Sequence, residues 1–414
     1  MIPSTPVNTL LRVAVIAGLW SGVVAQTPKE LSLQQLYERH SWFELRDAIA
    51  GRAVPALYAG AVASAFNRTR DAENLFKRAV REASSPEAAN DAREGLVDLY
   101  MRLGRSSDMI RVLDDAIATA PSRSDFRNAR QAFESFRRLP NQSARPGHHQ
   151  RFRCDVSAEG VVLPGLINGK TVHWLFDSAF SHTAMSESEA RMLGIPVQGA
   201  SAAAGDFAGG TAPMRTAVAE RVAIGDAELR NVPVLVFPDS QPPWNGQTSG
   251  KRGTFGLPVI LALQAIRWTK DGTCQLGSNP IRTAAPDGNL ALDGASPLIR
   301  VHYSDRPLEF VLDTGNQGGT QLWERFARDF PDVVRAGSKG TKQVHQIGGA
   351  TEQQIVSIPE LRLRVGGWGG LLQPANVFSP PIGNDFQHGN LGLDVLSQAA
   401  EVMIDFQAMT VTVR

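Results

Sequence analysis

The sequence predicts a multidomain α + β protein, with a helical region first and a mainly β part after it. Residues 26–138 hold apolar side chains at helical spacing and few glycines, which favours helices. From about residue 151 onward, short apolar or alternating runs separated by Gly, Pro and Asn favour strands. The β part also repeats at a fixed offset, which indicates an internal duplication of one β-rich unit.

A chain of 414 residues exceeds the size at which a single hydrophobic core stops growing, so several parts are expected. A segment rich in Pro, Gly, Asn and Asp at 277–294 separates the two copies of the β unit. We expect an export signal at 1–25, a helical region at 26–138, a linker at 139–150, and β units at 151–280 and 281–414.

The first 25 residues are typical of an export signal. Arg12 precedes an apolar run at 13–20, and Val23-Val24-Ala25 supplies small side chains at a cleavage point before Gln26. The run is too short for a comfortable membrane span, so no stable span is expected after cleavage. We therefore expect an exported protein, periplasmic or secreted. The alternative is an uncleaved anchor or a disordered start.

The helical region contains a weak repeat of its own. The stretch that begins at Gly60 is similar to the stretch that begins at Gly95, an offset of 35 residues. This is near the period of ~34 residues of tetratricopeptide repeats, and the region resembles a short array of such helix pairs. The resemblance implies a groove for a protein partner or a substrate peptide. The alternative is an ordinary helical bundle that covers one side of the β part or its entrance.

Two short stretches organise the β part. Leu175-Phe176-Asp177-Ser178-Ala179 and Phe310-Val311-Leu312-Asp313-Thr314-Gly315 are both apolar runs that end in a carboxylate, a small hydroxyl residue and a small residue. Such an apolar run is typical of a buried strand. A charge at the end of a buried strand is costly unless a site uses it. The sequence therefore predicts two carboxylates that are brought face to face.

The offset between the two stretches recurs along the β part. Asp313 lies 136 positions after Asp177, and the same offset carries Gly256 onto Gly392, each between apolar residues. It also carries residues 266–269 onto 402–405. The register slips only in the middle of the units, as loops of different length would cause. This pattern predicts a duplicated unit with one Asp in each copy.

An Asp-Thr-Gly motif after an apolar strand, followed much later by an apolar-Gly-apolar run, is similar to the motifs of the aspartic proteases. The likeness is to bacterial retropepsin-like enzymes, here with two lobes in one chain as in pepsin, and it implies a bilobal pepsin-like fold with a pseudo-twofold axis. Carried over by this resemblance, Asp177 and Asp313 are the catalytic pair. Ser178 and Thr314 would brace the pair, and Gly315 would support it.

The resemblance also implies a Gly-rich hairpin, the flap, that closes over the substrate in each lobe. The first flap is expected within 204–214 and its second-lobe equivalent near 345–351. An extended peptide or protein substrate would be held there by main-chain hydrogen bonds. The expected flap and substrate-binding residues are Phe207, Gly209, Gly210, Gly348 and Gly349.

One residue departs from the family's pattern. The first motif usually ends in Gly, and this chain has Ala179 at that position. The additional methyl group could crowd the partner loop. A non-catalytic peptide-binding or scaffold protein, with its function in the helical region, is therefore the alternative to an enzyme. A zymogen that needs trimming before about residue 150 is a third hypothesis.

The expected chemistry is the hydrolysis of peptide bonds by an aspartic-type endopeptidase without cofactor or metal. Peptide hydrolysis needs an activated water and an acid for the leaving nitrogen, and two carboxylates that share one proton supply both. Such a pair titrates as a unit, so the sequence assigns neither role to one Asp. The motifs of zincins and of Gly-x-Ser-x-Gly hydrolases do not occur in the chain.

Composition and cysteine usage complete the sequence-based expectations. The net charge of +1 gives no reason to expect a nucleic acid partner. Cys154 lies in the first strand-like run of the first β unit and Cys274 in its last. Opening and closing strands can lie side by side, and an oxidising compartment would permit a disulfide there. Two buried free thiols are the alternative.

Overall fold

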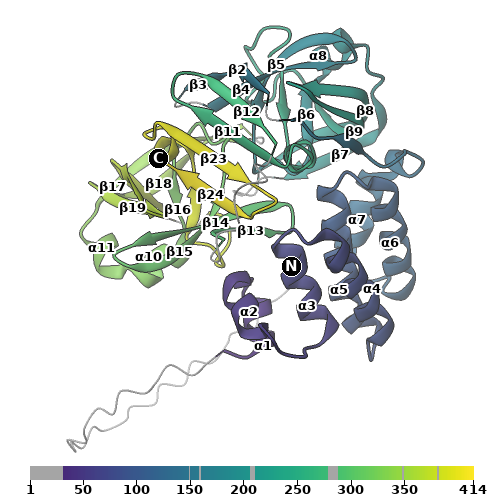
Figure 1. The fold of residues 1–414 in the computed structure, drawn as a ribbon, viewed down its shortest axis with the longest axis horizontal. Coiled ribbons are helices and arrows are strands. Elements are labelled where there is room, and N and C mark those ends of the chain that lie inside the picture. The colour runs from purple at the N-terminus through teal and green to yellow at the C-terminus, as the bar shows by residue number, and fades with distance from the viewer. Residues whose placement is uncertain are drawn as a thin grey trace, which may run out of the picture.

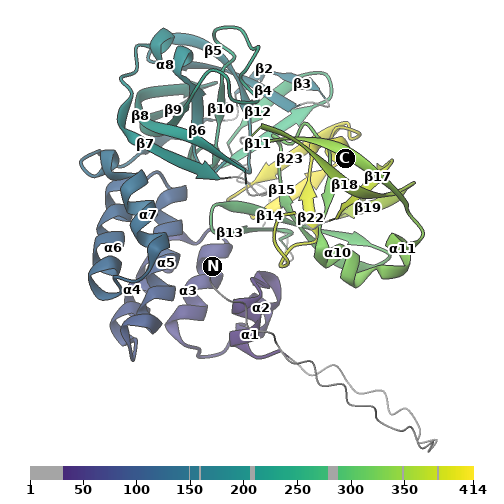
Figure 2. The same cartoon turned by 180° about the vertical axis from the view of Figure 1, so that it is seen from behind.

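A computed structural model describes residues 31–148, 150–157, 160–205, 210–277, 288–346, 349–379 and 382–414. The described chain begins with helices and continues as β sheets with few short helices, which confirms the α + β prediction (Figures 1 and 2). The expected export signal lies outside the described residues. None of the helices in the described ranges is long and apolar enough to cross a membrane.

The N-terminal helices pack as successive neighbours, and small residues set their spacing. Phe76 of α4 lies between α3 and α5, where a methyl group on Gly60 would come within 2.9 Å of its ring and one on Gly95 within 2.5 Å. The repeated glycines therefore make room for one aromatic ring. The helices are α1 Leu33–Glu38, α2 Trp42–Ile49, α3 Ala56–Ala65, α4 Thr69–Glu82, α5 Pro86–Arg102, α6 Ser106–Thr119 and α7 Ser124–Ala132, followed by the 3-10 turn η1 Glu134–Phe136.

The first β sheet closes on itself, because β9 pairs with both β6 and β8. Its strand order is β1-β9-β6-β10-β5-β4-β8-β7, and β3 pairs with β4. The segment 139–150, expected as a linker, contributes the edge strand β1. The elements are β1 Ser143–Arg145, β3 Asp155–Ser157, β4 Gly160–Ile167, β5 Lys170–Phe176, β6 Thr183–Ser186, α8 Glu187–Leu193, β7 Gln198–Gly205, β8 Thr211–Ile224, β9 Ala227–Phe237, β10 Gly253–Phe255 and α9 Leu257–Ala262.

A second sheet joins the first β unit to the end of the chain, in the order β2-β12-β11-β23-β24. In its centre β11 pairs antiparallel with β23, and Arg267 lies opposite Met403. Its strands are β2 Arg151–Arg153, β11 Ala265–Thr269, β12 Thr273–Leu276, β23 Glu401–Asp405 and β24 Thr410–Val413.

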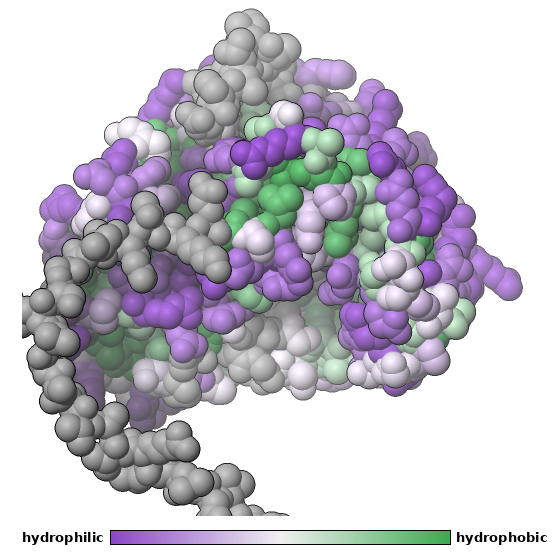
Figure 3. Space-filling model, turned by 90° about the horizontal axis from the view of Figure 1, so that it is seen from below, coloured by the Kyte–Doolittle hydropathy of each residue, from purple (hydrophilic) through white to green (hydrophobic). Residues whose placement is uncertain are grey.

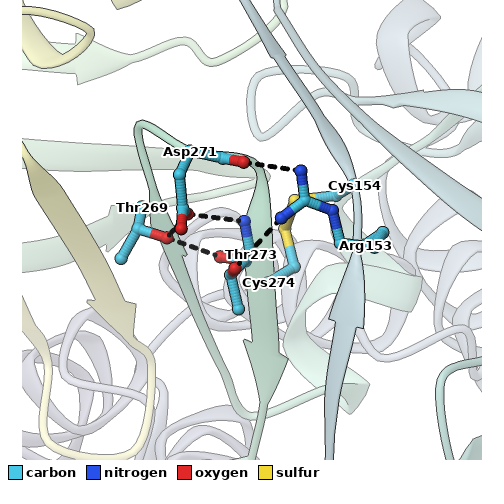
Figure 4. The surroundings of a disulfide bond; sticks show 6 residues. All are labelled: Arg153, Cys154, Thr269, Asp271, Thr273 and Cys274. Atoms are coloured by element: carbon cyan, nitrogen blue, oxygen red, sulfur yellow. Dashed lines mark hydrogen bonds between the residues drawn. A yellow bond between two sulfur atoms is a disulfide. The ribbon is translucent and has the colours of Figure 1, made fainter.

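Cys154 and Cys274 form a disulfide beside this second sheet. Their sulfur atoms are 2.05 Å apart, and the bond links residues separated by 120 positions (Figure 4). Cys154 directly follows β2, and Cys274 lies in β12, which pairs with β2. The guanidinium group of Arg153 donates a 2.7 Å hydrogen bond to the carbonyl oxygen of Asp271 at the same place. The start and the end of the first β unit are therefore joined covalently.

The third sheet has the order β17-β18-β21-β16-β22-β15-β14-β19-β20, with β13 paired to β14. Its elements are β13 Leu290–Asp293, β14 Ser296–Tyr303, β15 Arg306–Leu312, β16 Gln321–Leu322, α10 Glu324–Asp329, α11 Pro331–Arg335, β17 Ser338–Gln346, β18 Gly349–Ile358, β19 Leu361–Val365, β20 Trp368–Leu372, β21 Ala375–Phe378, β22 Gly389–Leu391 and α12 Leu393–Leu396.

The helices and the third sheet share buried contacts. The apolar core of the helices continues into Ala291, Leu298 and Val311 of the third sheet. The buried Arg102 donates a 3.1 Å hydrogen bond to the carbonyl oxygen of Gly294 in the β13–β14 turn. The face seen from below, where α1 and α2 lie, mixes hydrophilic side chains with smaller hydrophobic areas (Figure 3). The helical region is thus packed onto the β part.

The disulfide should contribute substantially to stability, because it closes a loop of 120 residues in the unfolded chain. We expect replacement of Cys154 and Cys274 by Ala together to lower the free energy of unfolding by roughly 3–5 kcal/mol. Guanidinium denaturation of the variant and of the reduced wild type measures this loss. An unchanged midpoint in both would contradict the expectation.

Asp98 of α5 makes the interface between the helices and the third sheet sensitive to pH. A methyl group on Gly294 would lie 3.1 Å from Asp98 Oδ2. Burial, with a smaller contribution from Glu94, raises the pKa of Asp98 from 3.8 to about 7. An acid whose pKa is raised on folding destabilises the folded state once it ionises. The penalty is therefore absent below pH 3.8, grows with pH and is complete above pH 7.

We expect Asp98→Asn to raise the free energy of unfolding by about 1–3 kcal/mol at pH 8 and to change it little at pH 4. Urea denaturation at the two pH values measures the difference. Asp332→Asn, at a side chain that is 87% exposed, is the matched control and should have no effect at either pH. If the variant is no more stable than the wild type at pH 8, the ionised Asp98 does not destabilise the folded protein.

Candidate active site

Asp177 and Asp313 leave their sheets in the same way. Asp177 follows β5, and its backbone N–H donates to the carbonyl oxygen of Phe255 at 3.1 Å. Asp313 follows β15, and its N–H donates to the carbonyl oxygen of Leu391 at 2.9 Å. In each unit the Asp strand pairs in parallel with the strand that precedes an apolar-Gly turn, β10 or β22. Each carboxyl group is therefore held at the end of a rigid strand pair.

The carboxyl group of Asp177 is bound by its own loop. Its Oδ1 atom accepts hydrogen bonds from the backbone N–H groups of Ala179 and Phe180, both at 3.1 Å. Its other side borders the second motif, because a methyl group on Gly315 would lie 2.2 Å from the Asp177 Oδ2 atom. No side chain other than hydrogen fits there. The structure thus brings the first Asp against the loop of the second.

The carboxyl group of Asp313 has a different set of partners. Its Oδ1 atom accepts from the backbone N–H of Gly315 at 3.0 Å. Its Oδ2 atom accepts from the side-chain amide of Asn390 at 2.7 Å. Asn390 lies in β22 and is 4% exposed. The two carboxyl groups are therefore equivalent in backbone position and unequal in hydrogen bonding.

Ser178 and Thr314 join the two Asp loops by reciprocal hydrogen bonds. The N–H of Ser178 donates to the Thr314 hydroxyl at 3.0 Å, and the N–H of Thr314 donates to the Ser178 hydroxyl at 3.1 Å. Each hydroxyl also donates across to the other unit, Ser178 to Leu312 O at 2.6 Å and Thr314 to Phe176 O at 2.7 Å. Both side chains are at most 1% exposed. No water competes at such burial, so these bonds fix the distance between the loops.

The electrostatics of the pair follow from burial and proximity. Burial raises the pKa of Asp177 well above its usual range, and the charge of Asp313 raises it further. Burial also raises the pKa of Asp313, while the Asn390 amide and the backbone N–H of Gly315 oppose that shift. Both side chains keep some exposed surface. The charge of one ionised carboxyl group therefore makes ionisation of the other harder.

Two long hairpins stand where the flaps are expected. Gly210 lies between β7 and β8, and Gly349 opens β18 after the β17 strand. A methyl group on Gly349 would meet nothing within 4 Å, so its positive φ of 119°, not crowding, favours glycine there. Phe207, Gly209 and Gly348 lie outside the described residues.

The histidine nearest the first loop is part of the packing. His182 is 2% exposed, and its ring stacks on Phe133 with centroids 5.1 Å apart. Burial lowers its pKa to about 4, so its ring is neutral at higher pH. Within the described ranges, His, Cys, Asp and Glu side chains do not gather in groups of three that could hold a metal ion.

Comparison with known proteins supports the aspartic protease resemblance. The aspartyl protease family model matches residues 163–259, which include the first Asp motif and Gly256. A solved structure of a retropepsin-like aspartic protease from Rickettsia conorii is similar at 12% identity, over 33% of this chain and 94% of that chain, with a TM-score of 0.22. A TM-score of 0.22 is too low to show that the two chains share a fold. No curated protein matches the chain.

Asn390 is a site residue that the sequence analysis missed. It stands 136 positions after Thr254, directly before the Leu391-Gly392-Leu393 run. The signal that could have found it is an amide side chain between Gly389 and Leu391 in a buried strand, because a buried amide needs a hydrogen-bond partner.

The reciprocal hydroxyl bonds predict a stability defect at Thr314. Thr314→Val keeps the shape of the side chain but leaves the Ser178 N–H and the Phe176 carbonyl oxygen without their partner. We expect the free energy of unfolding to fall by about 2–4 kcal/mol. Thr341→Val, at an exposed position of β17, is the matched control and should change it by less than ~0.5 kcal/mol. Equal denaturation midpoints for the two variants would show that the hydrogen bonds of the Thr314 hydroxyl do not stabilise the fold.

Proposed function

We propose that the protein is an aspartic endopeptidase that hydrolyses peptide bonds through a water activated by Asp177 and Asp313. The observation that carries the proposal is the set of reciprocal bonds between Ser178 and Thr314, which hold the two Asp loops together. The substrate is an extended peptide that lies under the β7–β8 and β17–β18 hairpins. Phe207, Gly209, Gly210, Gly348 and Gly349 would contact its main chain.

The proposal includes a duplicated, bilobal fold with a pseudo-twofold axis. Its support is that an offset of 136 converts the printed bounds of four strands of the first unit into those of four strands in the second: β4 into β14, β5 into β15, β10 into β22 and β11 into β23. In the β11–β23 pair, Arg267 lies opposite Met403, its own counterpart at that offset. A residue that pairs with its own counterpart is what a local twofold axis requires.

The chemistry needs one ionised and one protonated carboxyl group. The ionised carboxylate takes a proton from water as the water oxygen bonds to the scissile carbonyl carbon, and the protonated carboxyl gives its proton to the carbonyl oxygen. The resulting tetrahedral diol breaks its C–N bond when the amide nitrogen receives a proton from the pair. As the C–N bond breaks, a hydroxyl of the diol gives its proton to the pair, so that the pair again holds one proton and the products are the carboxylic acid and the amine.

Export to the periplasm or the outside of the cell is part of the proposal. The Cys154–Cys274 disulfide supports it, since such bonds persist in oxidising compartments. The helical region is proposed as a tetratricopeptide-like array. Its buried contacts with the third sheet indicate that it stays attached and covers the β part, and is not a segment that is removed. A protein partner could still bind its outer face.

A non-catalytic peptide-binding protein is the second candidate, and Ala179 is the observation that favours it. The methyl group at this position replaces the hydrogen that Gly315 offers to the other carboxyl group. Such a protein would bind peptides without cleaving them.

The proposal predicts that Asp313→Asn and Asp177→Asn each reduce kcat/KM on a mixed peptide library by at least ~1000-fold, because each removes one half of the proton exchange. Cleavage is followed by mass spectrometry between pH 3 and pH 7. Asp332→Asn is the matched control and should retain wild-type activity, since its side chain is 87% exposed. Binding without cleavage in the wild type would favour the second candidate. Activity that appears only after trimming before residue 150 would indicate a zymogen.

A further inference from the structure

We propose that Asn390 is a positioning residue that keeps Asp313 as the ionised member of the pair and leaves the shared proton on Asp177. This inference rests on the proposed function and assigns the two roles within it. It makes Asp313 the group that takes the proton from water. Asp177 is then the group that donates to the carbonyl oxygen of the substrate.

The first argument is the hydrogen bond itself. The Asn390 side chain donates from Nδ2 to Asp313 Oδ2 at 2.7 Å, a short distance for an amide donor. Asn390 is 4% exposed, and its Oδ1 atom has no hydrogen-bond partner among the described residues. An amide N–H donates more strongly to a carboxylate than to a protonated carboxyl, whose own O–H must find an acceptor. The buried donor therefore favours negative charge on Asp313.

The second argument is that Asp177 has no matching side-chain donor. Its backbone donors both reach Oδ1, and the described contacts give its Oδ2 atom no donor. The residue that matches Asn390 at the offset of 136 is Thr254, which is 1% exposed and makes no hydrogen bond to Asp177 in the structure. The Oδ2 atom of Asp177 is thus the oxygen with a free position for a proton.

The third argument is steric and comes from Ala179. The Asp177 carboxyl group lies so close to Gly315 that a methyl group there would be 2.2 Å from its Cγ and Oδ2 atoms. The position that corresponds to Gly315 in the other loop is Ala179, which has that methyl group. Asp313 therefore cannot take the mirrored position, since real carbon atoms do not approach so closely. The departure from the family's pattern breaks the symmetry of the pair and turns Asp313 toward Asn390.

The electrostatics agree with this assignment. Burial and the negative charge of Asp313 raise the pKa of Asp177 well above its usual range. Burial also raises the pKa of Asp313, but the Asn390 amide offsets part of that rise. The neutral His182 packs beside the first loop, and no further charged side chain of the described residues contributes to either shift.

The test compares Asn390→Thr, which copies the residue at the matching position of the first unit, with Asn376→Thr. Asn376 is a similarly buried residue, 7% exposed, with no contact to either Asp. Loss of the amide donor should raise the lower of the two apparent pKa values of the pair by about one unit. The acidic limb of the kcat/KM profile should then move to higher pH, with a loss of ~10-fold below it. The alkaline limb should move less, and Asn376→Thr should move neither.

A titration without substrate separates this inference from the proposed function. The wild type and Asn390→Thr are labelled with ¹³C at the Asp carboxyl carbons, and Asp177→Asn and Asp313→Asn assign the signals. We expect Asp313 to titrate in the lower step and this step to move upward in Asn390→Thr. If the protein cleaves no peptide but the signals behave so, the proposed function fails and the role of Asn390 stands.

Several results would overturn the inference. A lower step that belongs to Asp177, or one that Asn390→Thr leaves in place, would show that the amide does not decide where the proton lies. A shift of the same size in Asn376→Thr would show a general effect of changes in the third sheet. If Asn390→Thr fails to fold, Asn390→Ser serves instead, and an unchanged lower step in that variant overturns the inference equally.

Discussion

The reciprocal hydrogen bonds between Ser178 and Thr314 are the interaction on which the rest of the site depends. Each hydroxyl accepts from the backbone of the other loop and donates to the strand before it. Because all these groups are buried, breaking one hydroxyl leaves two polar backbone groups without partners. The loops that carry the two carboxyl groups are in this way held together. The same bonds place Gly315 against Asp177.

The second sheet, the disulfide and the helical region also hold the two β units in place. The second sheet joins β11 to β23, so that strands far apart in the chain lie beside one another. The disulfide ties the start of the first β unit to its end. The helical region adds buried contacts to the β13–β14 turn through Arg102 and to the third sheet through its apolar core. The two β units are therefore held together by main-chain pairing, and the helices contact both of them.

The backbone holds the two Asp loops in the same way, while the side chains around the two loops differ. The strands that match at the offset of 136 place each Asp at the end of a parallel strand pair. The replacement of a glycine by Ala179 on one side, and the amide of Asn390 on the other, make the two places chemically unequal. A buried donor next to one carboxylate lowers its proton affinity relative to its neighbour. In the proposed mechanism, these two residues decide which Asp acts as the acid and which as the base.

Local sequence pattern was enough to predict a helical region before a mainly β part, the offset of 136 between the two Asp motifs, and the candidate residues Asp177, Asp313, Ser178 and Thr314. These are properties of local pattern, because strand periodicity and short motifs depend on neighbouring residues. Only the tertiary structure decided which hydroxyl binds which backbone group, that Asp313 is bound by Asn390, and that Gly60 and Gly95 share one phenylalanine ring. Such contacts depend on distances of a few tenths of an ångström between residues far apart in the chain, and no local pattern contains that information.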